Sequence, residues 1–262
     1  MKPDATSNSP KANRLREIWS RGGVTLGAIV TSPSISVVQV MARSGLDWII
    51  IDLEHGAIDL KDAHSMIAAT GGTPLVPLVR VPEREAWHAK APLDLGAMGI
   101  CFPMTTTGAD ARAATRAVRY PPQGDRFWGP FYAPLRWDMT MRDYLTRADD
   151  EVLAIGTIEH IDALKTISDV VSTPGLDVAF IGPGDLATSM GLKGDREHPS
   201  VREAIGQLET AILGSPTVLG GVAPTVDEAN TMIRRGYRAL VVGFDWSLLQ
   251  RGIGTAIDGI NR

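Results

Sequence analysis

Two acidic residues, Glu159 and Asp185, each follow a short apolar stretch with the composition of a buried parallel strand. A helical stretch separates the two apolar stretches, and Asp185 comes just after the turn GPG. A strand–helix–strand unit of this kind places its strands side by side, roughly 5 Å apart, so both acids emerge at one edge of the sheet. Two carboxylates this close repel each other unless a cation lies between them, and a divalent ion of the magnesium or manganese class suits oxygen ligands. The structural alternative is that Asp185 caps the next helix and that Glu159 faces solvent.

Other polar residues also occur where predicted strands end. Asp52 and His55 follow the strand in DWIIIDLEHG, and Arg80 ends the strand PLVPLVR. Barrel enzymes build their sites from residues at the carboxyl ends of strands. Alone, His55 would be a hydrogen-bonded turn residue and Arg80 a salt-bridge partner. Together with the two acids, they supply a base, a cation and two metal-type carboxylates.

Lysine is absent from these strand ends. A Schiff-base mechanism needs a desolvated lysine at the centre of the site, so we do not expect that mechanism. The residue types indicate instead that a metal polarises a carbonyl group and stabilises an enolate. The six lysines are Lys2, Lys11, Lys61, Lys90, Lys165 and Lys193.

The elements that position these residues alternate regularly between apolar strands and helices. This alternation, in a chain of 262 residues, predicts an α/β fold, a single-domain (β/α)8 TIM barrel. No G-x-G-x-x-G follows the first strand, which argues against a dinucleotide-binding sheet. We expect strands at about 23–30, 47–52, 74–80, 98–102, 152–159, 178–181, 217–221 and 239–244. We expect helices at about 14–21, 35–43, 59–69, 83–94 (broken or bent at Pro92), 107–118, 161–171, 201–213, 225–234 and 245–257.

Composition limits the function further. With 44% hydrophobic residues the chain can bury a large core, and its formal net charge of −4 provides no basis for binding nucleic acid. No apolar run approaches the roughly 18–20 residues that span a bilayer. Cys101, the only cysteine, lies in an apolar run, so we expect a buried structural thiol and a reducing, cytoplasmic location. Residues 1–13 are polar, so we expect a disordered tail before a barrel domain at residues 14–262.

Residues 119–151 interrupt the alternation between the fourth predicted helix of the repeat and the fifth strand. Long, aromatic-rich loops in barrels are usually packing or interface elements. We therefore expect an ordered insert that makes a subunit contact, or, as the second alternative, a wall of the active site. Seven of the chain's 15 aromatic residues lie here: Tyr120, Phe127, Trp128, Phe131, Tyr132, Trp137 and Tyr144.

Five motifs carry a resemblance to a known family. DWIIIDLEHG, LVRVP, LDLGA, TIEH and IGPGDLATSMGLKG with a following HP resemble the metal-dependent pyruvate aldolases of the HpcH/HpaI family. That family includes dihydroxyheptenedioate and 2-dehydro-3-deoxyglucarate aldolases, and the resemblance covers about residues 27–249. It implies a TIM barrel, usually hexameric, that binds Mg, Mn or Co. It also implies cleavage of 4-hydroxy-2-keto acids to pyruvate plus an aldehyde.

The resemblance assigns roles to individual residues. Glu159 and Asp185 would be the metal ligands, and His55 would be the base that acts through water on the 4-hydroxyl. Arg80 would face the keto oxygen and steady the enolate charge, for which a guanidinium is well suited. Asp94, in LDLGA, would orient His55 from close to a subunit boundary.

Two substrate-binding positions depart from the family pattern. Relatives commonly have glutamine where Thr157 stands, and the position of Gly184 is often serine or alanine. Backbone N–H groups of Gly184 and Asp185 would hold the substrate carboxylate. Since both changes lie beside the keto acid, we expect retained metal chemistry with an altered substrate preference, and decarboxylation is an alternative enolate reaction.

Two further functions stay open from the sequence. Gly220-Gly221 and Gly243 could cradle the phosphate of a barrel isomerase or synthase, although tight turns are the favoured explanation of these glycines. The second is a non-catalytic barrel kept for assembly through its aromatic insert.

Overall fold

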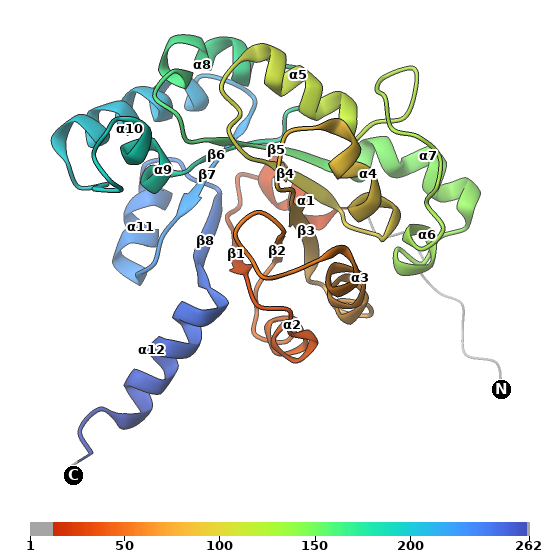
Figure 1. The fold of residues 1–262 in the computed structure, drawn as a ribbon, viewed down its shortest axis with the longest axis horizontal. Coiled ribbons are helices and arrows are strands. Elements are labelled where there is room, and N and C mark those ends of the chain that lie inside the picture. Colours follow the sequence, from red (N-terminus) through yellow and green to blue (C-terminus); the bar gives the residue numbers. More distant parts are fainter. Residues whose placement is uncertain (1–12, 261–262) are drawn as a thin grey trace.

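The computed structural model describes residues 13–260, in which eight parallel strands form a closed barrel surrounded by helices (Figure 1). The strands pair in chain order, and β8 pairs with β1 to close the barrel. The predicted TIM barrel is therefore confirmed. The strands are β1 (Thr25–Val30), β2 (Trp48–Asp52), β3 (Val76–Arg80), β4 (Gly99–Phe102), β5 (Leu153–Ile158), β6 (Val178–Ile181), β7 (Val218–Val222) and β8 (Ala239–Phe244).

Several helices begin where the sequence supplies a cap. Asp59, Thr107 and Thr225 each form a capping box with the acid three residues later, which satisfies N–H groups that have no acceptor within the helix. The helices are α1 (Arg14–Ser20), α2 (Ile35–Met41), α3 (Leu60–Ala69), α4 (Ala86–Asp94), α5 (Gly108–Ala117), α6 (Ala133–Arg136), α7 (Met141–Glu151), α8 (Ala163–Val171), α9 (Pro183–Ser189), α10 (Pro199–Leu213), α11 (Val226–Arg234) and α12 (Asp245–Ile257).

Three expectations about local structure need correction. Of the two alternatives expected at Pro92, a break does not occur: helix α4 continues to Asp94, because the proline removes only one N–H from a helix whose end is held by later bonds. The segment after β6 forms a separate short helix, α9, which the strand–helix alternation did not predict. Asn13 is not part of a disordered tail: its side chain donates to the carbonyl oxygens of Met98 (3.2 Å) and Glu151 (2.9 Å). Residues 1–12 of that predicted tail lie outside the described residues.

The insert at residues 119–151 is more structured than an ordered loop, because it contains α6 and α7. Six of its seven aromatic residues form two groups, and the seventh, Tyr120, is half-buried. Trp137 and Tyr144 are buried and meet edge to face, with ring centroids 4.9 Å apart. The other group is exposed on the surface and comprises Phe127, Trp128, Phe131 and Tyr132.

Helix α12 projects away from the barrel instead of lying along it (Figure 1). Its start is fixed because the buried Asp245 accepts hydrogen bonds from the backbone N–H groups of Thr31 (3.2 Å) and Ser32 (2.9 Å). Beyond this anchor the helix exposes a stripe of apolar side chains at helical spacing: Trp246, Leu249, Ile253 and Ile257. Within residues 13–260, no helix has the length and apolar character needed to cross a membrane.

Candidate active site

Glu159 lies directly after β5 and is almost completely buried at the carboxyl end of the barrel. Its Oε1 accepts a hydrogen bond of 2.6 Å from the backbone N–H of Met104, a residue in the left-handed region at φ 52°. Its Oε2 faces Gly182, where an added Cβ would lie only 2.9 Å away. The loops after β4 and β6 therefore hold this carboxylate from two sides.

The charge on Glu159 is poorly compensated by the chain. Burial raises the pKa of Glu159 to about 7, the carboxylates of Glu54 and Asp185 add to this rise, and only the Met104 N–H and Arg80 oppose it. A carboxylate that is buried and surrounded by further acids is stabilised by a bound cation. The environment of Glu159 therefore fits a divalent metal ion.

Asp185 is the second acid of the predicted pair. It is exposed and lies in the first turn of α9, which begins directly after β6. Among residues 13–260, no group of three or more His, Cys, Asp or Glu side chains is arranged to hold a metal ion. Glu159 and Asp185 would thus hold the ion as a pair of oxygen ligands, a donor set that suits Mg²⁺ because this ion keeps several waters and substrate oxygens in its shell.

Arg80 is held at the barrel rim by a bidentate interaction with the Asp52 carboxylate. Its Nε and Nη2 donate to the two carboxylate oxygens at 2.9 and 2.6 Å, and the Asp52 side chain is completely buried. The two residues are paired in the register of β2 and β3. A third atom of the guanidinium, Nη1, lies 3.2 Å from Oε2 of Glu54. Arg80 is consequently a fixed cation with its charge shared between two acids.

The turn after β2 places His55 beside this cluster. Oδ1 of Asp52 accepts hydrogen bonds from the N–H groups of Glu54 (3.1 Å) and His55 (3.3 Å). Gly56 is required next, since an added Cβ would lie 2.2 Å from the carbonyl oxygen of Asp52. The His55 side chain is 63% exposed, and its Nε2 lies 3.8 Å from Oε2 of Glu54. The imidazole is therefore accessible to a substrate at the rim.

Glu54 and Asp52 belong to this cluster, although we had given Asp52 no role in the site and had not included Glu54 at all. Burial raises the pKa of Glu54, Arg80 and His55 oppose the rise, and Asp52 and Asp185 add to it. Asp52 was recognisable as a rim residue from its place at a strand end. For Glu54 the only signal in the sequence was its position beside His55 in the turn, and this position does not show that the side chain points inward.

The remaining predicted site residues do not all lie in the cluster. Thr157 is buried two residues before Glu159, with its hydroxyl 3.4 Å from Sγ of Cys101, which is the buried thiol that we predicted. Gly184 is exposed, and an added Cβ there would meet nothing within 4 Å. Asp94 accepts a 3.0 Å hydrogen bond from Arg126 of the insert, and among residues 13–260 no hydrogen bond or ion pair joins it to His55. The structure thus brings Glu159, Asp185, Arg80 and His55 together but leaves Asp94 elsewhere.

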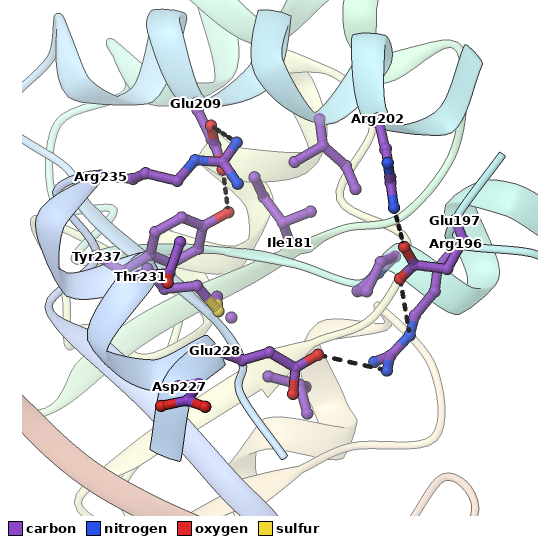
Figure 2. A pocket seen from close by; sticks show the side chains of 15 residues that line it. Ile181, Arg196, Glu197, Arg202, Glu209, Asp227, Glu228, Thr231, Arg235 and Tyr237 are labelled. Carbon is purple, nitrogen blue, oxygen red and sulfur yellow. Dashed lines mark hydrogen bonds and ion pairs between the residues drawn. The ribbon is translucent and has the colours of Figure 1, made fainter. Parts of the chain in front are cut away.

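A cavity of about 610 Å³ lies next to this rim, between α10, α11 and the ends of β6 and β7, but it does not contain the acidic pair (Figure 2). Most of its charged groups already have partners: Glu209, for example, forms an ion pair with Arg235 and accepts a 2.7 Å hydrogen bond from the Tyr237 hydroxyl. Its glycine, Gly221, is explained by packing, since an added Cβ would lie 2.8 Å from the Tyr237 ring. We therefore take as the candidate site the acidic rim and not this cavity. The acidic rim comprises Asp52, Glu54, His55, Arg80, Glu159 and Asp185.

The burial of Glu159 makes the stability of the metal-free protein depend on pH. Its pKa of about 7 lies above the ordinary value of 4.5, so the folded chain binds this proton more tightly than the unfolded chain. Because of Glu159, we expect the free energy of unfolding to fall by roughly 3 kcal/mol as the pH rises from its ordinary pKa of 4.5 to its pKa of about 7 in the folded chain. Urea unfolding in EDTA, at about pH 5 and about pH 7.5, measures the loss.

The matched variant is Glu159→Gln, whose amide does not ionise in this range. We expect its free energy of unfolding to lack this part of the pH dependence. If wild type and variant lost the same stability between the two pH values, Glu159 would not be the desolvated acid described above.

The sequence and fold place the chain among known proteins. A family model described as HpcH/HpaI aldolase/citrate lyase matches residues 27–251. The 2-dehydro-3,6-dideoxy-6-sulfogluconate aldolase of Pseudomonas putida is 31% identical over 231 residues, which cover 87% of this chain and 89% of the relative. The 4-hydroxy-2-oxo-heptane-1,7-dioate aldolase of Escherichia coli is 32% identical, with 91% of each chain covered.

The fold agrees with this sequence similarity. A HpcH/HpaI aldolase/citrate lyase family protein from Burkholderia cenocepacia J2315 has a TM-score of 0.88 at 32% identity, covering 94% of this chain and 98% of the other. The family model spans nearly the whole barrel, including every residue of the acidic rim. The chain therefore belongs to the HpcH/HpaI aldolase/citrate lyase family.

Proposed function

We propose that this enzyme is a divalent-metal-dependent aldolase that cleaves or forms 4-hydroxy-2-keto acids through a pyruvate enolate. The observation that supports it best is the buried Glu159, whose raised pKa marks an acid in need of a cation, beside Asp185 and the fixed Arg80. Glu159 and Asp185 would hold Mg, Mn or Co. When bound, the ion polarises the keto group of the substrate.

The other rim residues would act on the substrate directly. Arg80 faces the keto oxygen and stabilises the negative charge that develops there, with its orientation set in advance by the two bonds to Asp52. His55 takes the proton of the 4-hydroxyl, either directly or through one water, since its imidazole is exposed at the rim. Cleavage then leaves pyruvate and an aldehyde.

The departures from the family pattern lie beside the keto acid. Gly184 and Asp185 would offer N–H groups of the first turn of α9 to the substrate carboxylate, because these groups have no acceptor within the helix. Thr157 is short and already beside Cys101, so it leaves room where a glutamine would reach the substrate. We infer a substrate preference different from that of relatives with glutamine at this position.

The test is release of pyruvate from a panel of 4-hydroxy-2-keto acids, assayed with and without EDTA. We expect release from at least one member, loss of release in EDTA, and recovery when Mg²⁺ or Mn²⁺ is added in excess. Release that is indifferent to EDTA, or phosphate-dependent turnover of a sugar without any metal, would contradict the proposal. The single buried thiol at Cys101 supports a reducing, cytoplasmic location for this activity.

We also propose that the enzyme is a homo-oligomer, a hexamer by its resemblance, in which a second copy covers the apolar stripe of α12. The four stripe residues are 46–66% exposed, although a helix of this composition normally packs against a barrel. In such an assembly Asp94 could reach His55 of a neighbouring copy, as the resemblance implies, since it does not do so within one chain.

Two charges introduced into this stripe should change the assembly. We expect Leu249→Asp/Ile253→Asp to have a smaller mass than the wild type in sedimentation experiments, because the buried contact would have to desolvate two carboxylates. Thr255→Asp, on the opposite side of the same helix, is the control and should keep the wild-type mass. An unchanged mass in the double variant would remove α12 from the interface.

A further inference from the structure

We propose that Glu54 is a positioning residue that stabilises the protonated form of His55 during carbon–carbon cleavage, while it also contacts Arg80. This inference rests on the proposed aldolase function. Glu54 is in the turn between Asp52 and His55, and its side chain is only 18% exposed. A carboxylate in this position faces both cationic groups that the reaction needs.

The position of one carboxylate oxygen of Glu54 supports the inference. Oε2 of Glu54 lies 3.2 Å from Nη1 of Arg80 and 3.8 Å from Nε2 of His55. This oxygen is buried and accepts no hydrogen bond from any described residue, so its contact with Arg80 is an ion pair only. This oxygen therefore has acceptor capacity left for the imidazole of His55, the other cationic group within ion-pair distance of it among the described residues.

Arg80 does not need Glu54 to be held in place. Its Nε and Nη2 already donate hydrogen bonds of 2.9 and 2.6 Å to the Asp52 carboxylate, and the two residues are paired in the register of β2 and β3. His55, in contrast, has Glu54 as the one acid within ion-pair distance among residues 13–260. The acid that the resemblance gives to His55 is Asp94, which within the chain is bonded to Arg126. Glu54 is thus the acid that each copy supplies to its own His55.

The charge changes in the cleavage step show what Glu54 contributes. The O–H bond of the 4-hydroxyl breaks and its proton goes to His55, so the imidazole becomes positive. The oxygen electrons form the aldehyde carbonyl, the bond between carbons 3 and 4 breaks, and its electron pair becomes the enolate opposite Arg80. The Glu54 carboxylate stabilises the new positive charge at His55, and an orienting carboxylate does the same for histidine bases of other enzymes.

The test uses Glu54→Gln, which keeps the shape of the side chain but removes its charge. We expect kcat for cleavage to fall about 10- to 100-fold, the range seen when an outer carboxylate partner is lost, with KM within about threefold of wild type. Mn²⁺ affinity, measured by calorimetry, and the melting temperature should stay close to the wild-type values. Glu85→Gln, an exposed acid at the start of α4 that makes no cap hydrogen bond, is the matched control and should keep wild-type kcat.

A double-mutant cycle separates action through His55 from action through Arg80. In a His55→Ala background, Glu54→Gln should add less than about a twofold loss of cleavage. Exchange of the methyl protons of pyruvate, which forms the enolate without the hydroxyl proton transfer, should be kept within about threefold in Glu54→Gln.

Three outcomes would overturn the inference: wild-type cleavage in Glu54→Gln, a full further loss in the His55→Ala background, or an equal loss of methyl exchange. These outcomes differ from failure of the proposed function, in which the wild-type enzyme itself would release no pyruvate in a metal-dependent manner.

Discussion

Asp185→Ala is expected to abolish binding of the divalent cation and to reduce turnover at least about 1,000-fold, because the Lewis acid supplies several kcal/mol of the stabilisation. The barrel should stay folded. Asp185 is exposed in the first turn of α9, so its removal creates no cavity and leaves no buried group without a partner. Mn²⁺ binding followed by calorimetry, together with the melting temperature of the metal-free protein, separates the two effects.

Asp227→Ala is the matched control, because Asp227 is also an exposed acid in the first turn of a helix that follows a barrel strand. We expect wild-type metal affinity and turnover in this variant. Retained activity in Asp185→Ala, or an equal loss in Asp227→Ala, would contradict the assignment of Asp185 as a ligand.

Arg80→Met is expected to lower both activity and stability. Loss of the guanidinium should slow exchange of the pyruvate methyl protons by about 100- to 1,000-fold, the usual effect of removing one preorganised donor to a developing oxyanion. The same change leaves the completely buried Asp52 without its partner, which we expect to cost about 3–5 kcal/mol of unfolding free energy. Urea unfolding and proton exchange followed by NMR measure the two losses.

A second variant keeps the two effects apart. Arg80→Met/Asp52→Leu removes both buried charges, so it should recover part of the stability while exchange stays slow. The recovery is partial because the N–H groups of Glu54 and His55 lose their acceptor in this variant. Arg84→Met is the control. Arg84 lies in the loop after β3 and forms a partly exposed ion pair with Asp110 of α5. Loss of this ion pair should cost no more than about 1 kcal/mol of unfolding free energy. Recovery of exchange in the double variant would mean that Arg80 matters only for folding.

The barrel fold explains how residues that are distant in the sequence meet at the acidic rim. Asp52 and Arg80 are opposite each other in the β2–β3 register, and Glu159 follows β5 at the same end of the barrel. Parallel strands present their carboxyl ends together, so residues distant in the sequence meet without a dedicated loop. The left-handed backbone of Met104 adds one local constraint, because it turns an N–H toward Glu159.

Much of this arrangement was predictable from the sequence. Apolar runs with a polar residue at their ends determine the eight strands, because a strand buried on both faces must be apolar throughout and can carry charge only where it emerges. The expectation that Glu159, Asp185 and Arg80 lie at the same end of the barrel followed from that rule. The helices expected at 59–69 and 107–118 begin directly after Asp59 and Thr107, which the structure shows to be their caps.

Other features were decided by tertiary structure alone. The inward direction of Glu54 and its position between Arg80 and His55 depend on a turn closed by Gly56, which no strand or helix period encodes. The contact of Asp94 with Arg126 depends on how the insert folds back onto α4, and the exposed stripe of α12 depends on the anchor at Asp245. Periodic patterns report only whether a residue faces a core. The direction of a turn side chain and the partner of a long-range ion pair are determined by three-dimensional packing, so the sequence by itself specified the barrel and its acidic rim but not these contacts.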